Sequence, residues 1–205
     1  MAHRFVAALA VVAVAVSVSA APEPEPFPTR WEFDMVPGDL RFTVVEGENG
    51  EPTPVFYLTY AVTNYSSRDR IFAPSFELLT DQGQLLRAGR GVVPEVTRSL
   101  LERLDDPFLE DQFSIVDTLR QGRENTRFGL VVWPATDLDI DEITIFAAGF
   151  SGESTTYFTN DPESGRRNRH ILRKTRVLEY DTPGNLVPTT RTTTIDRSGE
   201  AWVMR

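Results

Sequence analysis

Basic residues crowd one short segment of an acidic chain. The sequence of 205 residues has 21 lysines and arginines against 30 acidic residues, a formal net charge of -9. Guanidinium groups bind carboxylates and phosphates in bidentate geometry, so this segment could contact an anion. Internal pairing with the acidic excess, on a solvated loop, is the alternative. The segment consists of Arg166, Arg167, Arg169, His170, Arg173, Lys174 and Arg176.

Alternating carboxylates suggest a second kind of site. Asp137, Asp139 and Asp141 are spaced as at the start of a calcium-binding loop, because calcium prefers oxygen ligands. The sixth position of such a loop is Glu142 instead of glycine, and the twelfth is Ala148 instead of glutamate. A strand edge with a solvated acidic face accounts for the same pattern, and we predict no metal site.

Further acidic residues surround the end of a predicted helix. Glycosidase chemistry needs two carboxyl groups about 5–10 Å apart, and a single sequence does not show which acids meet in space. A secreted carboxylate-based hydrolase acting on polysaccharide is therefore our alternative function. The residues are Glu102, Asp105, Asp106, Glu110 and Asp111.

Histidine and cysteine chemistry is restricted. His3 lies in the predicted signal peptide, which leaves His170 for any Ser-His-Asp triad or metal site. The sequence around Ser151 lacks the last glycine of a nucleophile elbow. The chain contains no cysteine, which excludes disulfides, thiol catalysis and thiolate metal sites. We expect no catalytic residue and no cofactor.

The N-terminus has the pattern of a secretory signal peptide. Arg4 precedes an apolar run over residues 5–18, and Ser19 and Ala20 supply small residues for cleavage. We predict a signal peptide over residues 1–20 and a periplasmic or secreted mature protein. No later run reaches the ~18 apolar residues of a membrane-spanning helix. The Pro/Glu-rich residues 21–30 predict an extended spacer.

These candidate residues must be positioned by short strands. Residues 55–64 are the clearest strand, with Phe56, Leu58, Tyr60 and Val62 on one face. Many short strands with frequent turns are typical of an antiparallel sandwich. The other predicted strands cover residues 31–35, 40–45, 71–79, 84–86, 113–119, 126–133, 142–150, 170–180 and 191–204.

One segment has helical periodicity. Val96, Leu100 and Leu104 recur every four residues, and Pro94 suits a first helical turn. The sequence predicts an amphipathic helix over residues 94–104 that covers one end or side of the sheet.

Several strand motifs resemble a known class of domain. VFYLTYAVTNYSS (residues 55–67), FELLTDQG (76–83) and FGLVVW (128–133) are similar to secreted bacterial immunoglobulin-like domains of unknown function. The resemblance covers roughly residues 55–150 and implies a binding or spacer module. In it, the amide of Asn64 ends a strand and caps the next turn.

Together these observations predict an all-β protein. We expect an antiparallel immunoglobulin-like β-sandwich over residues 31–160, with one short amphipathic helix. A C-terminal strand extension over residues 161–205 carries the basic segment. We expect an exported, non-enzymatic binding or structural module of the cell envelope, with an envelope protein or acidic polysaccharide as partner. The net negative charge argues against nucleic acid and anionic membranes.

Overall fold

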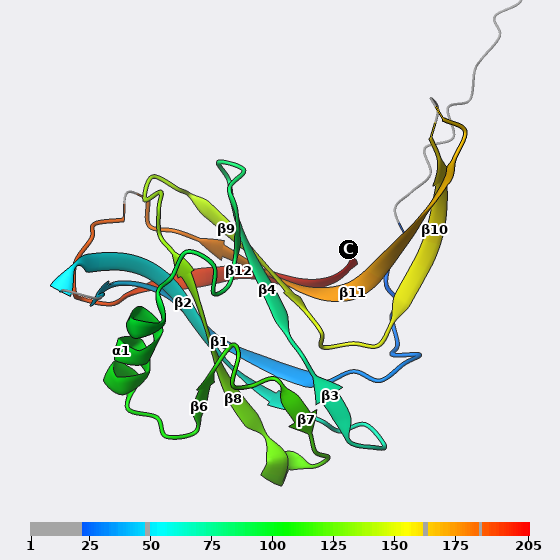
Figure 1. Cartoon of the computed structure of the whole chain (residues 1–205), viewed down its shortest axis with the longest axis horizontal. Coiled ribbons are helices and arrows are strands. Elements are labelled where there is room, and N and C mark those ends of the chain that lie inside the picture. The colour runs from blue at the N-terminus through cyan, green and yellow to red at the C-terminus, as the bar shows by residue number, and fades with distance from the viewer. Residues whose placement is uncertain (1–21, 48–49, 162–163, 185) are drawn as a thin grey trace, which may run out of the picture.

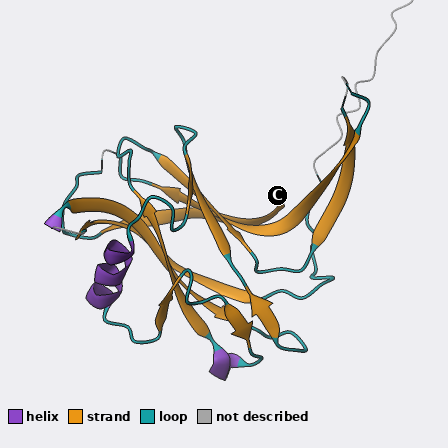
Figure 2. Ribbon diagram, viewed as in Figure 1, coloured by secondary structure: helices purple, strands orange, loops and turns teal. Residues whose placement is uncertain are grey.

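The computed structural model describes residues 22–47, 50–161, 164–184 and 186–205. The predicted signal peptide lies outside these residues. The described chain forms twelve strands, one α-helix and a short 3-10 helix (Figures 1 and 2). Their bounds are β1 (Asp34–Glu46), β2 (Pro52–Thr63), β3 (Arg70–Phe72), β4 (Ser75–Thr80), β5 (Leu85–Arg87), α1 (Pro94–Leu104), β6 (Leu109–Asp111), β7 (Asp117–Leu119), η2 (Arg123–Asn125), β8 (Arg127–Pro134), β9 (Glu142–Ala148), β10 (Ser154–Asn160), β11 (Arg167–Asp181) and β12 (Thr193–Met204).

One long sheet contains ten of the strands described. Nine of them follow the order β5-β4-β9-β11-β12-β1-β2-β8-β6, and β10 pairs with β11 beside this path. Neighbours are antiparallel except for β6 and β8, which pair in parallel over three residues. β3 and β7 form a separate small sheet. The predicted all-β class is confirmed, and so is the antiparallel character of the main sheet.

Strand β12 belongs to both halves of the sheet. Its first residues, 193–195, pair with β1, and the residues from Asp196 onward pair with β11. The sheet thus curls over itself, and side chains from β4, β9 and β11 share one core with side chains from β1, β2 and β8. Phe150 lies within this core, with its ring 5.2–5.8 Å from those of Phe72, Phe76 and Tyr60.

Both faces of β2 are buried along much of its length. Its inward face carries the predicted set Phe56, Leu58, Tyr60 and Val62 into the main core. Its outward face packs Val55 and Tyr57 against Val96 and Leu100 of α1 in a second cluster. The predicted helix is therefore confirmed, and it covers the outer face of the sheet. The tight turn after β2 is also as predicted, because the amide of Asn64 donates to the carbonyls of Arg68 (3.0 Å) and Leu119 (2.9 Å).

Three strand predictions are wrong in detail. Predicted residues 71–79 split at Pro74, and the two parts, β3 and β4, belong to different sheets. Predicted strand 40–45 and the end of predicted strand 31–35 belong to one strand, β1, with an irregular register between Pro37 and Leu40.

The third error concerns residues 113–119. Their first half is a turn, because the carboxylate of Asp111 accepts hydrogen bonds from the backbone N–H of Phe113 (2.7 Å) and Ser114 (3.1 Å). Only Asp117–Leu119 forms a strand there.

Strand β10, residues 154–160, was not predicted from the sequence. The polar stretch after Ser151 contains strand β10, which gave no period-two burial pattern because neither of its faces is covered. Within the described residues, no helix has both the length and the apolar character needed to cross a membrane.

Candidate functional site: a basic ribbon arm

Strand β10 and the first half of β11 form a two-stranded ribbon that leaves the body of the protein (Figure 1). The pairing runs from Ser154 opposite Arg173 to Asn160 opposite Arg167. The second half of β11, from Lys174 onward, lies between β9 and β12 in the body. We call residues 154–161 and 164–173 the ribbon arm. It places most of the basic segment away from the main core.

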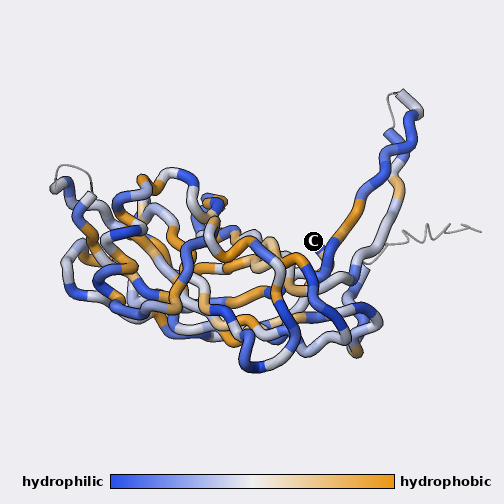
Figure 3. The backbone as a smooth tube through the Cα atoms, turned by 60° about the horizontal axis from the view of Figure 1, so that its bottom comes forward, coloured by the Kyte–Doolittle hydropathy of each residue, from blue (hydrophilic) through white to orange (hydrophobic). Residues whose placement is uncertain are grey.

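One face of the ribbon arm is both basic and apolar. Because side chains alternate along a strand, Arg167, Arg169, Ile171 and Arg173 share a face with Phe158 of β10. Phe158 and Ile171 are each 49% exposed. The guanidinium of Arg167 lies over the Phe158 ring, 3.9 Å from its centroid. We call this the arginine face. Hydrophobic residues of the arm, outside the body, are visible in Figure 3.

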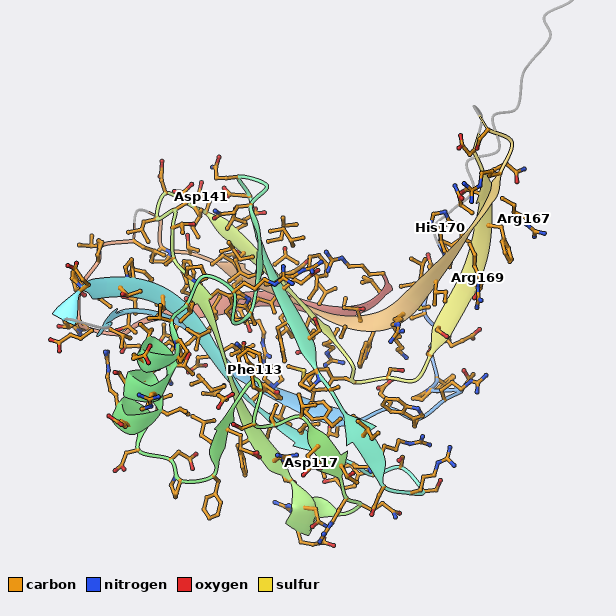
Figure 4. The ribbon with its side chains drawn as sticks, viewed as in Figure 1. Phe113, Asp117, Asp141, Arg167, Arg169 and His170 are labelled. Carbon is orange, nitrogen blue, oxygen red and sulfur yellow. The ribbon has the colours of Figure 1, made fainter. Side chains whose placement is uncertain are left out.

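The opposite face of the ribbon arm is polar and aromatic. The rings of Tyr157 and His170 stack with centroids 4.8 Å apart. The Nε2 atom of His170 lies 2.8 Å from the hydroxyl of Thr159. Figure 4 shows His170 on the arm with Arg167 and Arg169, far from Asp117 and Asp141 on the body. Among the described residues, the His170 ring contacts Tyr157 and Thr159, and no hydrogen bond or ion pair joins it to a carboxylate.

Two members of the predicted basic segment lie at the base of the arm and have acidic partners. Lys174 is buried, with its Nζ atom 3.0 Å from Glu32 and 3.4 Å from Glu153. Arg176 forms an ion pair with Glu200. The residues that project to solvent are Arg166, Arg167, Arg169 and Arg173. Fewer basic residues are accordingly available for anion contact than the sequence indicated.

The base of the arm also holds part of the predicted N-terminal spacer. The backbone N–H of Glu25 donates to the Glu153 carboxylate (2.9 Å), and Lys174 donates to the Glu25 carbonyl (3.4 Å). The backbone N–H of Gly152 donates to the carbonyl of Trp31 (2.9 Å). These contacts fix the direction in which the arm leaves the body.

Several of the other carboxylate candidates have local structural roles. Asp137 accepts a hydrogen bond from the N–H of Asp139 (3.0 Å) in the connection before β9. Within the described ranges, no three His, Asp or Glu side chains are grouped to hold a metal ion. Asp105 ends α1 through its backbone, because its N–H donates to the carbonyl of Leu101 (3.1 Å). Glu110 pairs with Arg127, and its hydrogen bond raises the pKa of that guanidinium.

A groove beside α1 is a second concave feature. It has a volume of about 540 Å³, and its apolar walls include Val92, Pro94, Leu101 and Phe113. Asp111 lies at its edge. Partial burial raises the pKa of this carboxyl, but hydrogen bonds from Ser114 and from two backbone N–H groups outweigh that and lower the pKa overall. The aspartate is thus charged and already satisfied by its own turn.

Sequence reasoning placed Ile171 on one strand face with Arg173, as observed, but it did not identify the aromatic members of the arm. Tyr157 and Phe158 stand next to each other in a polar stretch, and that pair was the available signal. Their pairing with β11 depends on the hairpin register, which a single sequence does not give. The chain was also compared with models of protein families, with curated proteins and with solved structures, and no match was found.

Proposed function

We propose that this protein is an exported, non-enzymatic binding module of the cell envelope that holds an anionic partner through its ribbon arm. The observation that carries the proposal is the composition of the arm. Its two paired segments, residues 154–160 and 167–173, contain no acidic residue, and three arginines share a face with exposed Phe158 and Ile171.

The length of the arm explains how an acidic protein could still bind an anion. Seven residue pairs extend the ribbon by about 20 Å at ~3.3 Å per residue. Dissolved salt screens interactions between exposed charges that are more than about 8 Å apart at physiological ionic strength. An anion at the outer part of the arm therefore responds to Arg167 and Arg169 more than to the net charge of the chain.

Export and the finer fold assignment belong to the same proposal. The N-terminal pattern of residues 1–20 supports secretion, and the absence of cysteine is compatible with a fold that needs no disulfide. Two facing layers of strands around an aromatic core support an immunoglobulin-like β-sandwich. The parallel pair β6–β8 and the ribbon arm are additions to that plan.

The test compares two triple variants that remove the same charge. Arg167, Arg169 and Arg173 are replaced by serine on the arm, and Arg68, Arg120 and Arg123 are replaced by serine on the body. Binding of each purified protein to native envelope fractions is measured by co-sedimentation at low and physiological salt. We expect the arm variant to lose at least about tenfold in affinity, and the body variant to change less than about threefold. Equal binding by both variants would contradict the proposal.

A further inference from the structure

One edge of the ribbon arm has no neighbouring strand among the described residues. Strand β12 follows β11 through the body as far as Arg205, which exchanges two backbone hydrogen bonds of 2.7 and 3.0 Å with Arg173. Peptide groups alternate in direction along a strand, so the N–H and C=O groups of Arg167, Arg169 and Ile171 point the same way as those of Arg173. We call this side of residues 167–172 the open edge.

A ribbon of two strands is incomplete as a stable unit. An isolated hairpin is marginally stable in water, and a third strand or a packed face is needed for independent stability. The open edge supplies three N–H donors and three C=O acceptors in ladder geometry, from Arg167, Arg169 and Ile171. Ile171, which is half-exposed on the arginine face, would gain a cross-strand neighbour at the same time.

The charges beside the open edge restrict which strand can pair there. Side chains directly opposite each other on neighbouring strands lie about 4.5–5.5 Å apart at Cβ, and like charges at that distance repel. A second copy of the arm would oppose arginine with arginine, so the edge is protected against self-association. A strand with carboxylates at alternate positions would meet Arg167 and Arg169 favourably.

We propose that the open edge accepts an extended acidic segment of an envelope protein as the third strand of the arm. This inference rests on the proposed function and names its partner. Running antiparallel to β11, the segment would continue the line of β12. It would place an apolar side chain opposite Ile171 and acidic side chains opposite Arg169 and Arg167. The recognised pattern is therefore apolar-x-acidic-x-acidic.

Two observations favour a peptide strand over an acidic polysaccharide. A polysaccharide offers carboxylates, but it cannot complete a ladder with alternating backbone donors and acceptors. It also offers no apolar side chain for Ile171. Charge also favours the β11 edge of the ribbon over the β10 edge for an acidic segment. The paired segment of β10, residues 154–160, has no charged side chain.

The first test uses three labelled nine-residue peptides. One contains Val-Thr-Glu-Thr-Glu flanked by threonines, and a second has lysine in place of each glutamate. A third keeps the glutamates but has N-methylated amides at the valine and both glutamates, the residues placed opposite Ile171, Arg169 and Arg167. Fluorescence anisotropy with the full chain measures binding. We expect saturable binding of the first peptide, and at least about tenfold weaker binding of the other two. Equal affinity for the methylated and unmethylated acidic peptides would overturn the strand ladder.

The second test changes one backbone group of the open edge. Ile171→Pro removes an N–H that points away from β10, so the pairing within the ribbon keeps its hydrogen bonds. Ile171→Thr is the matched control, because it reduces the apolar side chain and keeps the N–H. We expect a loss of at least about tenfold in peptide affinity for the proline variant and less than about threefold for threonine. Similar losses in both variants would count against strand addition, and the peptide series decides independently if the proline variant folds poorly.

Polygalacturonate separates the failure of this inference from the failure of the proposed function. If the arm arginines are needed for envelope binding and polygalacturonate saturates the arm while the acidic peptide does not, the partner is a polysaccharide and the strand proposal is wrong. If the arm arginines are not needed for envelope binding, both proposals fail.

Discussion

The body and the ribbon arm are both built from paired β-strands, yet they bury their apolar side chains to different extents. In the body, Trp133 and Phe150 are fully buried between two layers of strands. In the arm, Phe158 and Ile171 remain 49% exposed on a ribbon with both faces open. The body is therefore stabilised by burial of apolar side chains, whereas the arm buries little and depends on its anchorage at Lys174.

Among the variants that test this difference, truncation of a core aromatic side chain should reduce the free energy of unfolding most. Phe150→Ala removes the ring that contacts three other aromatic side chains, and we expect a loss of about 3–5 kcal/mol in the free energy of unfolding. Urea denaturation followed by fluorescence measures it. Phe158→Ala on the arm serves as control and should change stability by less than about 0.5 kcal/mol. Comparable losses at the two sites would mean that the arm contributes to the core.

Disruption of the ion cluster formed by Lys174, Glu32 and Glu153 at the base of the arm should have the second largest effect on stability. Lys174→Met leaves the carboxylates of Glu32 and Glu153 facing each other without their cation, and we expect a loss of about 2–3 kcal/mol because these groups are largely buried. Arg41→Met breaks the exposed pair with Asp39 and should cost less than about 0.5 kcal/mol. Thermal unfolding of both variants is the measurement, and a Lys174 variant as stable as the Arg41 variant would refute a role for the cluster.

A buried hydroxyl in the body gives a smaller, pH-dependent effect. The Tyr60 hydroxyl is buried, and no hydrogen-bond partner for it occurs among the described residues. Burial raises its pKa above the usual value of about 10. The unfolded chain therefore releases this proton first, and stability should fall as the pH rises above about 10.

Replacement of that tyrosine isolates its contribution. Tyr60→Phe should keep neutral-pH stability within about 1 kcal/mol, because it removes an unpaired polar atom from the core, and it should reduce the alkaline loss. Denaturant titrations at pH 7 and pH 11 test both statements. An unchanged alkaline slope in the variant would assign the effect to other groups.

The smallest expected effect concerns the arm itself. Phe158→Ser should leave the global unfolding free energy within about 0.5 kcal/mol of the original, since its ring contacts Arg167 instead of the core. Hydrogen exchange should nevertheless be faster at residues 154–160 than in β2. Protection in β10 equal to that in β2 would show that the arm is more stable than its burial indicates.

What the sequence predicted well has a local cause. The helix Pro94–Leu104 was predicted with its observed bounds because its apolar spacing and its first-turn proline act within eleven residues. Strand β2 was recognised because its composition suits a strand on either face. Asn64 was placed correctly at a turn because an amide side chain bonds to nearby backbone groups.

What the sequence could not predict depends on distant partners. Strand β10 buries neither face, so it lacks the alternation by which strands are identified. The burial of Lys174 depends on Glu32 and Glu153, which come from other parts of the chain. A basic run therefore divides into a structural cation and an exposed set of arginines, and only the folded structure shows where the division falls.

The path of β12 has a consequence for how the chain reaches this state. Its residues 193–195 pair with Leu40, Arg41 and Phe42 of β1, near the other end of the described chain. Contacts between such distant segments are slow to form, because a long loop must close before they contribute. The backbone pairing that joins the two layers through β12 can form only once residues 193–195 are present. If the protein is exported as we propose, strands β1 and β11 lack their pairing with β12 until these residues emerge, and unpaired strand edges are prone to aggregation in that interval.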